Sequence, residues 1–258
     1  MINQCVILAG GLGTRLRPIT EKIPKALVEV NGKPFLYWQL LDLKQQGFQR
    51  VLLLTGYLGE QVESVFGDGS SMGLHIEYSR EESPMGTGGA LRLAHAQLDS
   101  HFILLNGDSF LKAPLQQMTQ EFQLQNFAAM ISYFSRLNEV SVPANLRLER
   151  PSERVSAVIQ YEKGAGQEKG FQAVDSGVYV LSSALFDPLF LEGKAPDGKK
   201  YPLLKDSHRF QLEDLWLWAM EHKKLGAFLV EERFYDIGTP ERLRIFEEKI
   251  GDYFPNAL

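Results

Sequence analysis

Cysteine and histidine are scarce in this sequence, which holds one cysteine and five histidines in 258 residues. A single thiol excludes an internal disulfide framework. Cys5 lies in an apolar run, so we expect it to be buried and inert. The histidines do not show the close spacing of metal ligands. These absences argue against disulfide-stabilised proteins, zinc sites and Cys/His catalysis.

Long apolar runs and an excess of positive charge are also missing. No run reaches the roughly 18 residues that a membrane helix needs, and the formal net charge is −5. An acidic chain argues against a protein that coats nucleic acid or an anionic membrane. The N-terminal segment Met1–Gln4 carries no charged targeting region or cleavage site. We therefore expect a cytoplasmic protein without nucleic-acid or membrane partners.

A glycine-rich turn follows the first apolar segment. Val6–Ala9 predicts a short buried strand, and Gly10-Gly11-Leu12-Gly13-Thr14-Arg15 comes directly after it. Glycines let backbone N–H groups approach a polyanion closely, and an arginine offers a planar charged fork to phosphate oxygens. Lys25, which follows Pro24, supplies a second cation. The pattern predicts a cradle for nucleotide phosphates.

Two other phosphate-binding motifs are excluded at this turn. A dinucleotide fingerprint G-x-G-x-x-G that starts at Gly11 would need its closing glycine at position 16, where the chain has Leu16. The P-loop string G-x-x-x-x-G-K-[ST] does not follow the strand. A nicotinamide-dependent oxidoreductase is therefore not favoured.

Strand and helix patterns alternate through the first half, and strands of mixed direction are expected in the second. The pattern predicts one α/β domain over residues 1–258, a Rossmann-like three-layer sandwich around a mixed, mostly parallel sheet. Glu192–Lys200 is predicted to be a surface loop. The expected strands are Cys5–Ala9, Val51–Thr55, His75–Tyr78, His101–Leu105, Ala128–Phe134, Asn145–Glu149, Val155–Tyr161 and Val178–Leu181, the last three partly antiparallel, and the expected helices are Phe35–Gln46, Glu60–Phe66, Gly88–Leu98, Gln211–Glu221 and Arg242–Ile250.

Over essentially its whole length the chain resembles the sugar-1-phosphate nucleotidyltransferases, also called nucleotide-sugar pyrophosphorylases. Four segments in matching order carry the resemblance, and two shorter ones add to it. No hexapeptide-repeat tail follows the last helix, so we expect a single activity. The segments are Leu8–Lys25 with Gly32-Lys33-Pro34 after it, Pro84–Ala90, Asn106–Ser109 and Tyr235–Glu241, and then Gly56-Tyr57 and Tyr161-Glu162-Lys163.

The resemblance implies that a sugar 1-phosphate attacks the α-phosphorus of a nucleoside triphosphate and releases pyrophosphate. The attacking phosphate is already ionised, so positioning and charge neutralisation do most of the catalysis. Arg15 would hold the leaving pyrophosphate, and Lys25 would neutralise charge at the α-phosphate. The groups that donate to the triphosphate would come from Gly10, Gly11, Gly13 and Thr14.

Asp108 and Asp236 match the family's Mg²⁺ ligands. Mg²⁺ binds through one or two carboxylates together with phosphate oxygens and water. Asn106-Gly107-Asp108 alone is a common turn, and its pairing with Tyr235–Gly238 favours the metal site.

The remaining matches concern the nucleoside and the sugar. Gly86 and Thr87 resemble the loop beneath the base, and they also suit a helix N-terminus with Thr87 as its cap. Lys163 would bind the sugar phosphate and Glu162 a sugar hydroxyl, although an exposed ion pair explains the two as well. Asp175 replaces the asparagine found in many relatives, and Gly164 stands where a proline is frequent, so the sugar is left open.

Among family members the chain is most similar to short mannose- or manno-heptose-1-phosphate guanylyltransferases. Glu81 and Glu82 lie just before the base loop, and a carboxylate can accept from guanine N1–H and its amine. The alternatives are a uridylyl- or thymidylyltransferase for glucose 1-phosphate or an amino sugar, and a silent nucleotide-sugar sensor. Aromatic residues suited to either a core or a homo-oligomer interface are Trp216, Trp218 and Phe254.

Overall fold

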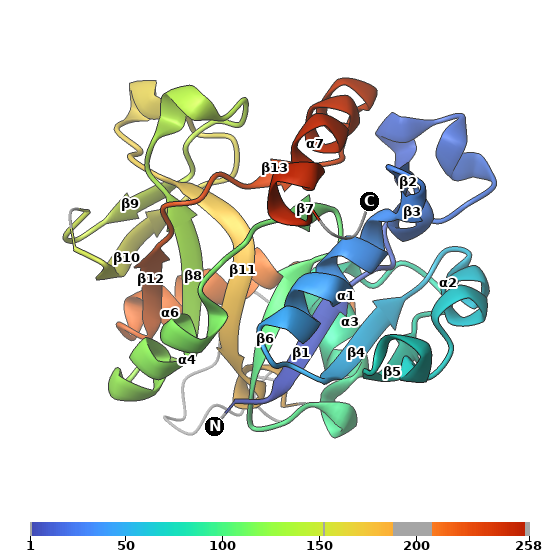
Figure 1. Cartoon of the computed structure of the whole chain (residues 1–258). Coiled ribbons are helices and arrows are strands. Elements are labelled where there is room, and N and C mark those ends of the chain that lie inside the picture. Colours follow the sequence, from blue (N-terminus) through green and yellow to red (C-terminus); the bar gives the residue numbers. More distant parts are fainter. Residues whose placement is uncertain (1, 152, 188–207, 256–258) are drawn as a thin grey trace.

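The computed structural model describes residues 2–151, 153–187 and 208–255. Within these residues one nine-stranded sheet runs through the molecule in the order β5-β4-β1-β6-β11-β8-β12-β10-β9 (Figure 1). Its strands are β1 (Gln4–Leu8), β4 (Arg50–Thr55), β5 (His75–Arg80), β6 (His101–Asn106), β8 (Ala129–Phe134), β9 (Leu146–Leu148), β10 (Val155–Tyr161), β11 (Val174–Ser182) and β12 (Leu225–Leu229).

The first four strands of this order are parallel and define the edge that carries the site. Leu8 at the end of β1 pairs with Leu54 of β4 and with Asn106 of β6. β11 is antiparallel to β6 and β8, and β10 is antiparallel to β12 and β9. β8 and β12 are parallel to each other. The predicted mixed, mostly parallel sheet is confirmed, as are its antiparallel members.

Helices cover both faces of the sheet and complete three layers (Figure 1). One core joins the sheet to apolar residues of α1, α2 and α4, and a second joins it to α3 and α6. The helices are α1 (Phe35–Gln45), α2 (Gly59–Phe66), α3 (Gly86–Leu93), α4 (Leu115–Leu124), α6 (Trp216–Glu221) and α7 (Pro240–Tyr253). Short 3₁₀ turns span Thr14–Leu16, Ile19–Glu21, Lys25–Leu27, Ser70–Met72, His95–Gln97, Leu137–Glu139, Gln167–Lys169, Ser183–Phe186 and Leu212–Leu215.

Two short ribbons lie outside the main sheet. β2 (Glu29–Val30) pairs with β3 (Lys33–Pro34), and β7 (Ser109–Phe110) pairs with β13 (Tyr235–Asp236). A third core of α1 and α7 side chains supports them, and within it the rings of Phe110 and Phe246 lie 5.3 Å apart. Thr239 caps α7 and Pro240 begins it, which suits a helix start.

Some boundaries differ from the sequence prediction. α3 ends at Leu93 instead of Leu98, and a 3₁₀ turn over His95–Gln97 follows it, where the Gln4 side chain bonds the Gln97 carbonyl and the Asp99 N–H. The first turn of the predicted Gln211–Glu221 helix is 3₁₀, and α4 and β12 were not predicted. Glu192–Lys200 lies outside the described residues.

Burial settles two of the three aromatic candidates for an interface. Trp216 and Phe254 are 1% and 2% exposed and belong to the core of this chain. Trp218 is partly exposed. In the described part of the chain, helices that are both long enough and apolar enough for a membrane span are absent.

Candidate active site

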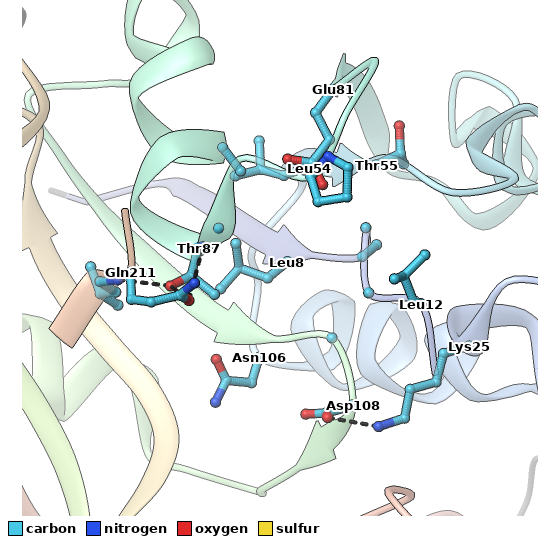
Figure 2. Close-up of a pocket in the computed structure, with 18 of the residues that line it drawn as sticks. Leu8, Leu12, Lys25, Leu54, Thr55, Glu81, Thr87, Asn106, Asp108 and Gln211 are labelled. Atoms are coloured by element: carbon cyan, nitrogen blue, oxygen red, sulfur yellow. Dashed lines mark hydrogen bonds and ion pairs between the residues drawn. The ribbon is translucent and has the colours of Figure 1, made fainter. Parts of the chain in front are cut away.

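A cavity of about 400 Å³ opens at the carboxyl ends of β1, β4 and β6 (Figure 2). Parallel α/β sheets collect ligands at this edge. Figure 2 shows the Lys25–Asp108 pair at one end of the cavity and Glu81 at the other. Eight of the predicted site residues line it, namely Gly10, Gly11, Lys25, Glu81, Gly86, Thr87, Asp108 and Lys163.

The glycine turn forms the floor of the cavity. A side chain at Gly10 would press against Gly56 and Glu81, whereas one at Gly11 would meet nothing within 4 Å. Gly13 has a left-handed backbone with φ of 61°, and its carbonyl accepts from the Thr20 hydroxyl at 2.7 Å. Gly13 and Thr14 do not line the cavity itself. The backbone of this turn is thus exposed to a ligand without side chains in the way.

Lys25 and Asp108 meet although they lie 83 positions apart. The Lys25 ammonium donates to Asp108 Oδ2 at 2.7 Å, and the lysine side chain is only 11% exposed. Burial alone would raise the pKa of Asp108, but the charges of Lys25 and Arg15 and the Ser109 hydroxyl hold it below the ordinary value. Asp108 is therefore an anion held against a cation at the cavity end.

Asp236 does not line this cavity and instead lines a smaller one with Arg242, but the β7–β13 ribbon brings its backbone next to that of Asp108. Asp236 pairs with Ser109 in the ribbon, and the Ile237 N–H donates to the Asp108 carbonyl at 3.0 Å. The Arg242 guanidinium binds both Asp236 carboxylate oxygens at 3.1 Å. Two acids far apart in sequence thus lie on neighbouring segments.

Arg15 lies near both acids. A side chain added at Gly238 would lie 2.7 Å from the Asp236 carboxylate and 2.9 Å from the Arg15 guanidinium, and the charge of Arg15 also acts on Asp108. Among the described residues the Arg15 guanidinium has no ion-pair partner. A solvent-exposed arginine therefore lies next to the acidic pair.

The described part of the chain holds no cluster of three or more acidic, histidine or cysteine side chains suited to a metal. Two carboxylates next to the glycine turn nevertheless fit Mg²⁺, which takes few protein ligands and completes its shell with phosphate and water oxygens. The donor set excludes a closed, all-protein metal site and suits one that is completed by substrate.

The start of α3 packs against residues 208–211. Side chains at Gly86 or Gly88 would overlap Phe210, and one at Gly89 would collide with the His208 carbonyl. The Gly88 and Gly89 N–H groups donate to the Phe210 carbonyl at 3.1 and 3.2 Å. These glycines accommodate another segment of this chain, and that segment forms a wall of the cavity.

Thr87 is not the cap of α3, so that prediction is wrong. The helix starts at Gly86, and the cap position is Met85 without a side-chain bond. The Thr87 hydroxyl instead lies 3.3 Å from Gln211 Oε1 and accepts from the Leu212 N–H at 2.8 Å (Figure 2). Thr87 therefore bonds residues that are distant in sequence instead of capping its own helix.

Glu81 lies at the far end of the cavity from Asp108. One carboxylate oxygen accepts from the Met85 N–H at 2.9 Å, and the other approaches Gly10 and Gly56. Burial raises the pKa of Glu81, against the Met85 N–H, which lowers it. This carboxylate is fixed between the glycine turn and the start of α3.

Glu162 and Lys163 do not pair with each other, which corrects the expected ion pair. Lys163 bonds Glu213 at 2.9 Å, whereas Glu162 bonds Lys169 at 2.6 Å. Lys163 and Glu213 both line the cavity, and Glu162 does not. The lysine thus lies at the cavity wall next to Glu213.

Asp175 lies behind the cavity and is already bonded. Its carboxylate accepts from the Gly177 N–H and the Tyr179 hydroxyl, each at 2.9 Å, and from the Tyr161 hydroxyl at 3.4 Å. Burial raises the pKa of Asp175 to about 6, although these three donors lower it. Tyr179, and not Asp175, lines the cavity.

The cavity residues that were not predicted as site residues include Asn106, Tyr179, Gln211 and Glu213, although Asn106 stands inside a predicted motif. Asn106 could have been chosen because it ends β6 beside Asp108. Tyr179 lies two positions after Asp175-Ser176-Gly177, the segment that differs from the pattern of many relatives. No sequence pattern marked Gln211 or Glu213 as site residues. Gln211 bonds Thr87, which lies more than a hundred residues away in sequence, and Glu213 bonds Lys163.

The chain is similar to known proteins over almost its whole length. Residues 4–251 match the family model described as nucleotidyl transferase. The D-glycero-alpha-D-manno-heptose 1-phosphate guanylyltransferase of Aneurinibacillus thermoaerophilus is 30% identical over 256 residues, covering 97% of this chain and 99% of that protein. The protein of the same name from Campylobacter jejuni is 30% identical over 239 residues, covering 92% and 96%. HddC from Yersinia pseudotuberculosis, solved in complex with GMP-PN, has a TM-score of 0.71 at 27% identity and covers 96% of this chain and 99% of that one. The chain therefore belongs to the nucleotidyl transferase family.

Proposed function

We propose that this protein transfers GMP from GTP to mannose 1-phosphate or manno-heptose 1-phosphate and releases pyrophosphate. The Lys25–Asp108 pair at the end of the cavity, with Arg15 and Asp236 next to it, is the observation that carries the reaction type. The sugar and base follow from the guanylyltransferase relatives of nearly equal length.

Charge neutralisation explains the choice of residues. The sugar phosphate and the triphosphate repel each other, so the site has to offset several negative charges. The exposed backbone of Gly10 and Gly11, together with Gly13 and Thr14, holds the triphosphate. Arg15 has a free guanidinium for the departing pyrophosphate, and Lys25 faces the α-phosphate from the cavity end.

Asp108 and Asp236 would hold Mg²⁺, which supplies positive charge to the phosphate oxygens when it is bound. The two carboxylates already face cations, Lys25 and Arg242 respectively. Both carboxylates are therefore oriented by this chain's own residues, and the charge of Lys25 holds the pKa of Asp108 below its ordinary value. The ribbon that joins their backbones fixes the spacing between them.

The cavity wall that carries Lys163 and Glu213 suits the sugar phosphate. Lys163 is exposed and can contact a phosphate after it leaves Glu213, with Glu162 close by for a hydroxyl. Asp175 acts on a sugar hydroxyl by orienting Tyr179, whose phenol reaches the cavity. The sugar would therefore be recognised by an aromatic hydroxyl backed by a carboxylate.

Guanine is supported by Glu81. Its carboxylate lies in the cavity at the end away from Asp108, with Gly86 and Thr87 at the adjoining helix start. A carboxylate can accept from guanine N1–H and the exocyclic amine together, which uracil and thymine do not offer.

A pyrophosphate-release screen tests the proposal directly. GTP, ATP, UTP and dTTP are each combined with mannose, manno-heptose, glucose and N-acetylglucosamine 1-phosphates in the presence of Mg²⁺. We expect the highest kcat/KM with GTP and a manno-configured sugar. A preference for UTP or dTTP with glucose 1-phosphate would contradict the guanylyl assignment, and no release from any pair would favour the sensor.

A further inference from the structure

The turn that carries Asp108 is short and tightly held. Asn106 ends β6 and Ser109 begins β7, so Asp108 sits where the chain leaves the main sheet for the ribbon. The Gly107 N–H donates to the Leu8 carbonyl at 3.1 Å, and a side chain at Gly107 would overlap that carbonyl. The backbone carbonyls of Asn106 and Ser109 lie on the two sides of Asp108 and accept from another part of the chain.

Both carbonyls are bound by one side chain. Gln39, in the middle of α1, donates from Nε2 to the Asn106 carbonyl at 2.9 Å and to the Ser109 carbonyl at 2.8 Å. Gln39 is 2% exposed, so these bonds are shielded from water. The side-chain nitrogen of Gln39 on α1 therefore binds the backbone on both sides of Asp108.

The other half of the Gln39 amide is not used in the same way. Gln39 Oε1 is buried and has no hydrogen-bond partner among the described residues. An unpaired buried acceptor is destabilising. The two bonds from the Gln39 nitrogen offset that cost in this structure.

We propose that Gln39 is a positioning residue for the metal site, which fixes the Asp108 carboxylate by clamping the carbonyls on either side of it. The proposal rests on the proposed role of Asp108 as a metal ligand. Gln39 acts from a rigid platform, because α1 packs into two of the cores through Leu36 and Trp38. Residues of this kind typically change metal affinity about 10- to 100-fold when they are lost.

The chain offers a matched control. Gln4 is also a buried glutamine, 1% exposed, and it also bonds two backbone groups, the Gln97 carbonyl at 2.7 Å and the Asp99 N–H at 2.8 Å. It lies at the amino end of β1, away from the cavity. Gln4→Met therefore removes a comparable pair of bonds without touching the Asp108 turn.

The experiment compares full-length wild type, Gln39→Met, Gln4→Met and Asp108→Asn. Binding of Mn²⁺, in the presence of a non-hydrolysable GTP analogue, is followed by the electron paramagnetic resonance signal of the free ion, and the Mg²⁺ dependence of turnover is measured in parallel. We expect Gln39→Met to weaken Mn²⁺ binding at least tenfold and to raise the Mg²⁺ requirement by a similar factor. Gln4→Met should lower the melting temperature and leave Mn²⁺ binding unchanged.

The outcomes separate the two assignments. If Asp108→Asn loses Mn²⁺ binding while Gln39→Met binds as wild type does, Gln39 is only structural and the positioning role is overturned. If Asp108→Asn itself binds Mn²⁺ as wild type does, the metal assignment fails and the role of Gln39 fails with it. Should Gln39→Met not fold, Gln39→Asn keeps an amide that is too short to bind both carbonyls, and weaker Mn²⁺ binding is again expected.

Discussion

The Lys25 ammonium is the most buried cation near the cavity end, and its partner Asp108 is a proposed metal ligand. Side-chain exposure is 11% for Lys25 and 40% for Asp108. A buried ammonium contributes more to charge neutralisation than an exposed one, because water screens it less. The effect of removing it should therefore appear in the step where charge moves between phosphates.

We expect Lys25→Ala to lower kcat by about 10²–10³-fold and to change the dissociation constant of GTP much less. Steady-state kinetics and calorimetric GTP binding measure the two quantities. Lys22→Ala is the control, because Lys22 is an exposed lysine on the same loop whose backbone carbonyl, not its ammonium, makes the bond to Gln61. A loss confined to GTP binding would contradict the role of Lys25 in the chemical step.

Single residues were predicted best where a motif fixed both type and spacing. Gly10, Lys25, Asp108 and Asp236 come from such motifs; the first three line one cavity, and Asp236 pairs with Ser109 next to Asp108. The partners of Glu162 and Lys163 were mistaken, because neighbours in sequence were assumed to pair. An ion pair follows spatial proximity, and the partners lie 7 and 50 positions away.

At the scale of elements, the contact between α3 and residues 208–211 joins the helix start that lines the cavity to the segment that carries Gln211. Gly88→Ala would normally stabilise a helix by about 1 kcal/mol. Here we expect a lower melting temperature and a higher KM for GTP, because the new methyl overlaps the buried Phe210 ring and pushes away the segment that carries Gln211. Thermal unfolding and steady-state kinetics measure both effects.

A second substitution, at Phe210, tests whether the overlap with this ring causes the expected loss of stability in Gly88→Ala. Phe210→Ala removes the ring, so the double variant should lose less stability than the two single losses added together. Purely additive losses would show that the Gly88 methyl acts on something other than Phe210.

Elements with a clear period were predictable, and very short ones were not. β10 was predicted with the bounds that it has, Val155–Tyr161. α4 carried a readable signal, since Leu115, Met118, Thr119 and Phe122 are its buried face at helical spacing. The strands β7 and β13 have two residues each, too few for any alternation, and the pairing between them is non-local. The part of the site that depends on this ribbon therefore rested on resemblance alone.

Across the whole molecule, buried acids make stability depend on pH. Burial raises the pKa of Asp42, on α1, to about 6 despite Gln46 and Lys112, and burial also raises the pKa of Asp175 to about 6. The folded state therefore binds these protons more tightly than the unfolded state, whose value is near 3.8. This stabilisation is full below pH 4 and is lost as pH rises through 6.

We expect Asp42→Asn to raise the free energy of unfolding at pH 7 by on the order of 2 kcal/mol and to change it little at pH 4. Urea unfolding at both pH values measures the difference. The control is Asp252→Asn at an exposed end of α7, where a small change is expected. An equal gain for Asp42→Asn at both pH values would show that ionisation is not the cause.

The α/β class and the layers of the whole molecule could be predicted from the alternation of strands and helices. The order of the strands in the sheet could not. Alternating β and α segments imply a layered parallel sheet. The place of β11 between β6 and β8 is set by pairings across dozens of residues, which no local pattern encodes. The fold class was thus accessible from sequence, and the wall that Gln211 and Glu213 form was not.

The β7–β13 ribbon also constrains when this site can form during synthesis. Its first strand leaves the ribosome more than a hundred residues before its second, at Ser109 and Tyr235. A nascent chain that has released only the amino-terminal half holds Asp108 but not Asp236, so it lacks one of the two acids. Premature termination before Tyr235 consequently yields a fragment without one of the two proposed metal ligands, and the proposed site is complete only after β13 pairs with β7.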